Sequence, residues 1–263
     1  MITKRTILPW LFVFIAVFLS SAGRAEISIN EKGKWKRIIP GLEMRVIKIT
    51  AERGPADIYA FRIDQKKLSI RVVDSRDYQQ KRLSVRSMTE VSGAVLAING
   101  GFFDTEEKHL GLLVRDGKTV SPYLKRDWGI FFMKKNRPFI IHSRKYKKDK
   151  GITQAVQVGP RLISRGKVLK LKKQFSRRSA VGIDGKERII LLVSGKNPDQ
   201  GILGLTELAE LMGLSLKKGG LGCQYALNLD GGASTQLYVN TDTFTLNLPG
   251  RWAVSNGLGV FRK

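Results

Sequence analysis

The sequence predicts an α+β fold dominated by β-strands, in which helices pack on a mixed or antiparallel sheet. Short apolar runs of strand length recur along most of the 263 residues. The hairpin dipeptides Asp116-Gly117 and Asp184-Gly185 lie between such runs. Only two segments show helical periodicity, and no Pro/Ser-rich linker divides the chain, which favours a single domain.

Each predicted strand is a run of apolar or alternating residues bounded by turn-forming residues. The sheet that these strands form is expected to be large and mostly antiparallel or mixed. The strands expected are, in chain order, 45–50, 57–63, 68–73, 94–98, 111–115, 129–133, 138–142, 154–158, 179–183, 189–193, 224–229, 236–239 and 257–262.

Two helices are expected between these strands. Residues 84–91 are short and moderately periodic. Residues 206–212 carry Thr206 as the expected N-cap and Gly213 as the expected residue beyond the C-terminus. Leu208, Leu211 and Met212 fall on one face of that helix, which should pack on the sheet.

The N-terminus has the pattern of a secretory signal peptide. Lys4 and Arg5 precede an apolar run at 7–19, and small residues follow at 20–25. The apolar run is shorter than the roughly 20 residues that a membrane span needs. We therefore expect residues 1–25 to be removed and the protein to be exported, periplasmic or secreted. An uncleaved N-terminal anchor is the alternative. Residues 26–44 are then an N-terminal segment, and 45–263 are the functional domain.

The chain is strongly basic, with 47 Lys and Arg against 22 Asp and Glu and a formal net charge of +25. It lacks an RNP pattern, zinc-finger spacing and a helix-turn-helix signature, so nucleic acid is not the expected partner. Anionic glycans, phosphate-bearing wall polymers or lipid headgroups fit an exported basic protein better. A peripheral membrane role would suit the charge, but no amphipathic basic helix supports it. The densest basic run, at 144–150, is expected to be a solvated loop.

Cys223 is the only cysteine, so the chain forms no internal disulfide. A catalytic thiol needs a neighbouring base, and the only histidines are His109 and His142. Because Cys223 comes just before a predicted core strand, we expect it to be buried and inert.

The most informative segment is 226–235, where an apolar strand ends abruptly in Asp230, Gly231 and Gly232. Glycines permit positive φ and let a ligand approach the backbone closely. An ordinary hairpin turn has the same composition. A second apolar strand, at 94–98, ends in the similar sequence Asn99-Gly100-Gly101. Two such turns suggest one shared pocket at the strand ends, the alternative being two unrelated turns.

Five sequence blocks occur in an order that resembles the phosphodiester glycosidase family, with its uncovering-enzyme-like domains. The resemblance covers about residues 45–263. Ala233 stands where the family often has a third glycine, and residues 252–255 are a loose version of the segment that usually follows the arginine. The blocks are 99–103, 159–163, 178–184, 229–235 and 251–260.

The resemblance implies hydrolysis of a sugar-1-phosphodiester in a glycoconjugate, surface polysaccharide or wall polymer. Cleavage at the sugar C1 passes through an oxocarbenium-like transition state with phosphate leaving. Asp230 is the first candidate carboxylate and Asp104 the second, although Asp104 could instead cap the following turn. Arg178 is the candidate phosphate clamp, since a guanidinium binds phosphate oxygens with two donors.

Further residues would hold the substrate: Asn99 by hydrogen bonds, Ser234 and Thr235 with the neighbouring amides as an anion nest, and Arg251 as a second clamp. No metal is expected; oxygen ligands in the cluster Glu106, Glu107 and His109 would favour Ca²⁺ or Mg²⁺ if one bound. A non-catalytic binder of anionic glycan or phosphate-bearing polymer is the alternative function. The substrate-binding candidates are Asn99, Gly100, Gly101, Gly231, Gly232, Ser234, Thr235, Arg251 and Asn256.

Overall fold

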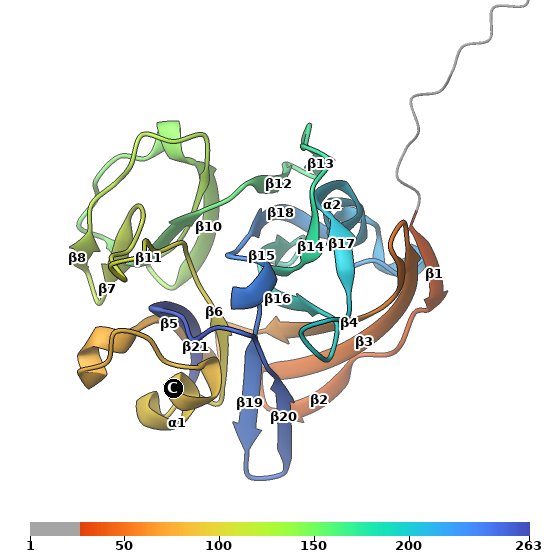
Figure 1. Cartoon of the computed structure of the whole chain (residues 1–263), viewed down its shortest axis with the longest axis horizontal. Coiled ribbons are helices and arrows are strands. Elements are labelled where there is room, and N and C mark those ends of the chain that lie inside the picture. The colour runs from red at the N-terminus through yellow and green to blue at the C-terminus, as the bar shows by residue number, and fades with distance from the viewer. Residues whose placement is uncertain (1–26) are drawn as a thin grey trace, which may run out of the picture.

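The computed structural model describes residues 27–263, and Figure 1 shows their arrangement. The predicted signal peptide at 1–25 lies outside the described residues. Within 27–263, no helix is long and apolar enough to cross a membrane. The described chain is mostly β-structure arranged in several sheets.

The largest sheet has nine strands, and its order is β1-β3-β4-β16-β15-β18-β12-β13, with β2 paired to β3. Its strands are β1 (Ser28–Glu31), β2 (Lys36–Ile39), β3 (Leu42–Ala51), β4 (Gly54–Ile63), β12 (Arg161–Ser164), β13 (Lys167–Val168), β15 (Ser179–Asp184), β16 (Ile189–Ser194) and β18 (Cys223–Asn228). The segment before residue 45 therefore contributes two strands to this sheet.

Two five-stranded sheets and a two-stranded ribbon complete the fold. The first has the order β10-β9-β11-β7-β8, the second β20-β19-β6-β21-β5, and β14 pairs with β17. Their strands are β5 (Leu68–Asp74), β6 (Leu96–Asn99), β7 (Leu113–Arg115), β8 (Lys118–Ser121), β9 (Gly129–Lys134), β10 (Arg137–His142), β11 (Ile152–Val158), β14 (Phe175–Arg177), β17 (Ile202–Gly204), β19 (Leu237–Thr241), β20 (Phe244–Leu248) and β21 (Asn256–Arg262).

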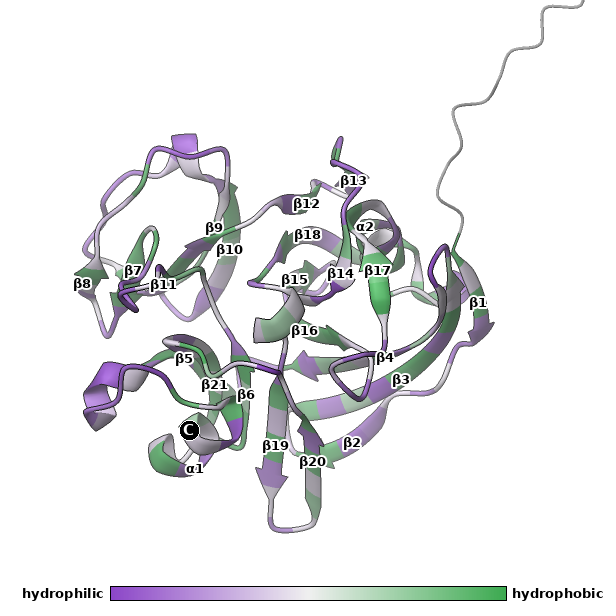
Figure 2. Cartoon of the chain, in the orientation of Figure 1, coloured by the Kyte–Doolittle hydropathy of each residue, from purple (hydrophilic) through white to green (hydrophobic). Residues whose placement is uncertain are grey.

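Every strand pairing among residues 27–263 is antiparallel. In β3, apolar and polar residues alternate except at Val46-Ile47, where the apolar positions change from one face to the other; Figure 2 shows the banding. By contrast, β15 and β16 are buried along their whole length, because they occupy the middle of the nine-stranded sheet. The main core lies between the sheets and includes Phe61, Leu191 and Leu227.

Both predicted helices are present, but the described residues are mostly β-structure in several sheets, so the α+β prediction overstated the share of helices packed on the sheet. Helix α1 (Val85–Ser92) is capped by Ser84, whose side chain accepts a hydrogen bond from the Ser87 amide. It packs on the sheet that contains β6 and β19. Helix α2 (Leu205–Gly213) packs on β12, β13 and β18. Short 3₁₀ turns occur at Ser75–Tyr78, Ser143–Lys145, Leu216–Lys218 and Gly232–Ser234.

Both predicted ends of α2 were wrong. Its N-cap is Gly204, not Thr206, because the Glu207 side chain reaches back and accepts a hydrogen bond from the Gly204 amide at 2.7 Å. Gly213 lies inside the helix, and the C-cap is Leu214. The predicted burial of Cys223 is confirmed, and burial raises the pKa of its thiol.

Candidate active site

The structure brings the two glycine-containing turns together, as the sequence predicted. The Asn99 side-chain Nδ2 donates a hydrogen bond to the Asp230 carbonyl oxygen at 2.5 Å. The Asp230 amide donates to the Gly100 carbonyl oxygen at 3.0 Å. Since β6 and β18 belong to different sheets, the candidate site forms where these two sheets meet.

A second donor fixes the same carbonyl group. The Ser179 hydroxyl, at the start of β15, donates to the Asp230 carbonyl oxygen at 2.8 Å. The Asn99 Oδ1 accepts from the Gln236 amide at 3.1 Å. Both polar atoms of the Asn99 side chain are therefore used by the backbone of the opposite turn. Asn99 is fully buried and holds the turn in place through these two hydrogen bonds.

Asn256 fixes the turn that follows Asn99. Its Oδ1 accepts from the Gly101 amide at 2.7 Å, and its Nδ2 donates to the Gly101 carbonyl oxygen at 3.2 Å. A Cβ atom on Gly100 would lie 2.1 Å from the Asn256 Oδ1. The glycine at position 100 is thus required by the close approach of this buried amide.

The Asp230 carboxyl group is the titratable group at the centre of the site. Burial raises its pKa to about 6, against hydrogen bonds from the Ser234 side chain and the Gly231 backbone that lower it. The chain turns sharply after Asp230, with Gly232 at φ 62°. A carboxyl group with this pKa exchanges protons near neutral pH, as a general acid or base must.

Ser234 and Thr235 differ in what their hydroxyl groups do. Ser234 is buried and hydrogen-bonds the Asp230 carboxyl group. The Thr235 hydroxyl instead donates to the Arg177 carbonyl oxygen at 3.2 Å. The Ser234 hydroxyl therefore lowers the pKa of the Asp230 carboxyl group directly, while the Thr235 hydroxyl fixes the end of the turn to Arg177.

Arg178 is buried beside the turn that carries Asp230. Its Nε donates to the Leu203 carbonyl oxygen at 3.1 Å, and its Nη2 donates to the Gln174 carbonyl oxygen. Its Nη1 lies 3.8 Å from the position that a Cβ atom on Gly231 would occupy. Burial lowers the pKa of Arg178 to about 10, so the guanidinium stays protonated at neutral pH.

No carboxylate among residues 27–263 forms an ion pair with Arg178. A buried cation without a counter-ion is costly, and an incoming anion offsets that cost. The geometry therefore makes this turn attractive to a phosphate group.

Arg177, which the sequence analysis passed over, has a structural role. Its guanidinium donates to the carbonyl oxygens of Ser194 at 3.0 Å, Gly195 at 3.0 Å, Thr235 at 2.8 Å and Pro249. Burial lowers its pKa to about 10. It joins β16 to the segments on either side of the β19–β20 hairpin.

Two predicted residues engage other partners. The Asp104 Oδ1 accepts from the amides of Glu106 and Lys108, each at 2.9 Å, so this carboxylate caps its own turn. The Arg251 side chain is exposed and pairs with Asp199. Its backbone amide, however, donates to the Ala233 carbonyl oxygen at 2.9 Å and so supports the Asp230 turn.

A buried histidine network lies behind Asn256. His109 Nε2 and Asp74 Oδ2 are 3.1 Å apart, and His109 Nδ1 lies 3.1 Å from both the Asn256 Nδ2 and the Ser255 Oγ. Burial raises the pKa of Asp74, but hydrogen bonds from His109 and Arg76 outweigh it and hold the pKa below its usual range. His109 therefore links the Asp74 carboxylate to Asn256, the residue that fixes the turn after Asn99.

Glu106, Glu107 and His109, which the sequence suggested as a possible metal site, point to different partners in the structure. Glu107 pairs with Arg82 and Glu106 with Lys108, while His109 turns inward to Asp74. In the part of the chain that the structure describes, no three His, Cys, Asp or Glu side chains are grouped as metal ligands would be. In the sequence, His109 follows Glu106 and Glu107, and this local pattern does not predict that its side chain is buried.

Comparisons with solved structures identify similar folds. The catalytic domain of zebrafish N-acetylglucosamine-1-phosphodiester α-N-acetylglucosaminidase, auto-inhibited by its pro-peptide, is 19% identical with a TM-score of 0.65; the alignment covers 90% of this chain and 88% of that one. A hypothetical protein from Synechocystis is 17% identical with a TM-score of 0.61, covering 88% of this chain and 64% of that one.

A third similar structure is a Burkholderia pseudomallei protein described as exported, 13% identical with a TM-score of 0.53 and coverage of 79% and 74%. A search of curated proteins finds no significant match. The sequence model of the phosphodiester glycosidase family matches residues 92–261, which include both turns, Arg178 and His109, while Asp74 lies before the matched segment. The chain therefore belongs to the phosphodiester glycosidase family.

Proposed function

We propose that this protein is an exported hydrolase that cleaves a sugar-1-phosphodiester in a glycoconjugate, surface polysaccharide or wall polymer. The observation that carries the proposal is the buried Arg178 guanidinium, without a carboxylate partner, beside a turn whose Asp230 has a pKa of about 6. Family membership and the fold shared with a phosphodiester glycosidase support it. Export is supported by the N-terminal pattern and by a similar protein described as exported.

In the proposed reaction, Arg178 holds the phosphate group and the backbone amides of the turn after Asp230 supplement it. The bond between the sugar C1 and the phosphate oxygen breaks, and its electron pair leaves with the phosphate. Because the departing phosphomonoester is a good leaving group once its charge is matched, little acid assistance is required there. The cation supplies the charge stabilisation that grows as the bond breaks.

In this proposal, Asp230 acts on the sugar, at the C1 end of the bond that breaks. Its carboxylate stabilises the positive charge that develops at C1 and accepts a proton from the attacking water. The water oxygen becomes the new C1 hydroxyl, and the products are a free sugar and a phosphomonoester. Both charges in this proposal come from protein side chains, Arg178 and Asp230, with no metal ion.

The remaining predicted residues divide into those that support these two groups and those that do not contact them. Asn99, Gly100, Gly101 and Asn256 hold the backbone that positions Asp230, because their polar groups bond one another and the turn. They are positioning residues in this proposal. Asp104 and Arg251 touch neither Asp230 nor Arg178 in any described hydrogen bond or ion pair, so we give them no chemical step.

The test is turnover of sugar-1-phosphodiesters. A panel in which the sugar varies and the second alcohol is a simple alkyl group should include at least one compound that releases free sugar. Asp230→Asn should abolish that release while leaving binding of the substrate measurable. Binding without release by the unmodified protein would instead favour the non-catalytic glycan binder.

A further inference from the structure

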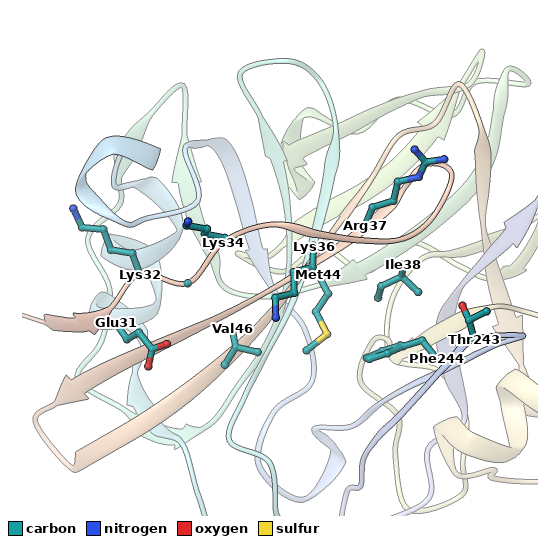
Figure 3. A pocket seen from close by; sticks show the side chains of 11 residues that line it. Glu31, Lys32, Lys34, Lys36, Arg37, Ile38, Met44, Val46, Thr243 and Phe244 are labelled. Carbon is teal, nitrogen blue, oxygen red and sulfur yellow. The ribbon is translucent and has the colours of Figure 1, made fainter.

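A groove of about 810 Å³ lies far from the Asp230 turn, beside β2, β3 and the β19–β20 hairpin (Figure 3). We call it the basic groove. It has an apolar floor and a rim of basic side chains. Its lining residues are Glu31, Lys32, Gly33, Lys34, Lys36, Arg37, Ile38, Met44, Val46, Thr243 and Phe244.

The floor of the basic groove consists of Ile38, Met44, Val46 and Phe244. All four are only partly buried and pack against the outer edge of the main core. In β3, Met44 and Val46 share one face, whereas Arg45 and Ile47 are buried on the other. The fold therefore leaves aliphatic and aromatic side chains accessible at this place.

The rim of the basic groove carries exposed positive charge. Among residues 27–263, Lys34, Lys36 and Arg37 form no ion pair with a carboxylate. Glu31, the one acidic lining residue, pairs with Lys48 at 2.7 Å. Figure 3 shows the Lys36 side chain beside Met44 at the centre of the groove.

The basic groove is separate from the candidate active site. Strand β19 begins just after Gln236, which contacts Asn99, and ends just before the hairpin turn that carries Thr243, with Phe244 as the first residue of β20. Its five residues span about 17 Å at roughly 3.4 Å per residue. A ligand in the groove would leave the Asp230 turn open.

We propose that the basic groove binds a membrane lipid with a phosphate headgroup, the acyl chain lying on the floor and the phosphate among the rim cations. This inference does not depend on the proposed hydrolysis. Neutral sugars favour aromatic faces and hydrogen-bonding side chains, but the lining holds one aromatic residue, Phe244, and one hydroxyl, on Thr243. Apolar contact plus clustered cations matches an anionic amphiphile.

The chain's own N-terminal segment is a poorer occupant. It is apolar at 7–19 but flanked by Lys4, Arg5 and Arg24, whose positive charges are repelled by the rim. An anionic headgroup is attracted instead, and the formal net charge of +25 adds a long-range attraction to a negative surface.

Vesicle binding by the full chain tests the headgroup part of the proposal. The chain should co-sediment with vesicles of equal phosphatidylglycerol and phosphatidylcholine, and much less with phosphatidylcholine alone. Each cation near an anionic surface is worth ~5-fold in binding, so Lys34→Gln with Lys36→Gln should weaken it ~25-fold. All variants share the same N-terminal segment, so differences between them report the groove.

The matched control removes two charges elsewhere. Lys147 and Lys148 lie in the exposed loop between β10 and β11, away from β2 and β3 in Figure 1. Lys147→Gln with Lys148→Gln should change vesicle binding by less than ~3-fold. Equal loss in both double variants would overturn the proposal in favour of unspecific charge attraction, and no loss in the groove variant would overturn it outright.

A soluble probe tests the apolar part. Dodecyl phosphate below its micelle concentration should bind, as measured by calorimetry, whereas inorganic phosphate at the same concentration should not. Met44→Gln keeps the side-chain length but makes the floor polar, and it should weaken dodecyl phosphate binding ~10-fold. Equal binding by Met44→Gln and the unmodified chain, with both folded by circular dichroism, would show that no acyl chain occupies the groove.

Discussion

The turns after β6 and β18 share the pattern polar–Gly–Gly but use the polar residue in opposite ways. In the first turn, both polar atoms of the Asn99 side chain bond the backbone of the other turn. In the second, the Asp230 carbonyl oxygen is held by Asn99 and Ser179, while the carboxyl group has a pKa raised by burial to about 6. The first turn therefore supports the second, which carries the carboxyl group that we propose to be reactive.

The adjacent arginines show the same division. Both are buried, and burial lowers both pKa values to about 10. Arg177 directs its guanidinium to four backbone carbonyl groups, whereas Arg178 has its Nη1 next to Gly231. The two arginines are therefore alike in burial and differ in the direction of their donors, and this difference is the reason for proposing Arg178, not Arg177, as the phosphate-binding residue.

The largest effect should come from Asp230→Asn. The variant keeps the shape but loses the charge, so kcat should fall at least ~10²-fold on any sugar-1-phosphodiester that the unmodified protein cleaves. Asp242→Asn, which removes an exposed carboxylate paired with Arg262, is the control and should keep normal kcat. Normal turnover by a folded Asp230→Asn variant would remove Asp230 from the mechanism.

Two conservative substitutions test whether the two arginines have different roles. Arg178→Lys should lose ~30-fold in kcat/KM, because a single ammonium group cannot reproduce the planar donor set, and it should lose less unfolding free energy than Arg177→Lys, since Arg178 bonds two backbone carbonyl groups rather than four. Arg177→Lys should instead cost roughly 2–4 kcal/mol of stability, since buried carbonyl groups lose their donors. Steady-state kinetics and urea denaturation measure the two effects. The reverse assignment of losses would exchange the roles of the two residues.

Stability should depend on pH through Asp230. Its folded pKa of about 6 exceeds the usual value of 3.8, so the protonated form stabilises the fold at low pH. That contribution, on the order of 3 kcal/mol, is lost as pH rises from about 4 through about 6. Asp230→Asn should therefore be more stable than the unmodified protein at pH 8 and equally stable at pH 4. A constant difference between them across this range would contradict the raised pKa.

The smallest catalytic effect is expected for Asn99→Ala. The supporting turn loses two side-chain hydrogen bonds, which should cost roughly 1–3 kcal/mol of unfolding free energy. Because Asn99 makes no proposed contact with the substrate, kcat should fall less than ~10-fold. A loss as large as that of Asp230→Asn, in a fully folded variant, would give Asn99 a direct role.

The strands were largely predictable because apolar runs are a local signal. All the predicted strands are present, with shifted ends. Strands β1 and β2 were missed because they are polar edge segments with little burial. The short strands β8, β12, β13, β14 and β17 were missed as well. Strand β20 was also missed, although Phe244-Thr245-Leu246-Asn247-Leu248 alternates strictly and carried a usable signal.

The site was predictable in part for a different reason. Strand-end turns with paired glycines identified Asn99 and Asp230, and their meeting is confirmed by direct hydrogen bonds. The partners of Arg177 and Arg178 are backbone carbonyl groups, which every residue has, so no side-chain pattern marks them. His109 likewise meets Asp74 and Asn256 from distant parts of the chain.

The junction of two sheets at the candidate site has a kinetic consequence. Asn99 and Asp230 are separated by 131 positions, so their contact closes a very long loop. Contacts of this kind form late, since the chain must lose much conformational freedom before they contribute. During refolding, recovery of any activity should therefore lag behind the appearance of β-structure in far-ultraviolet circular dichroism.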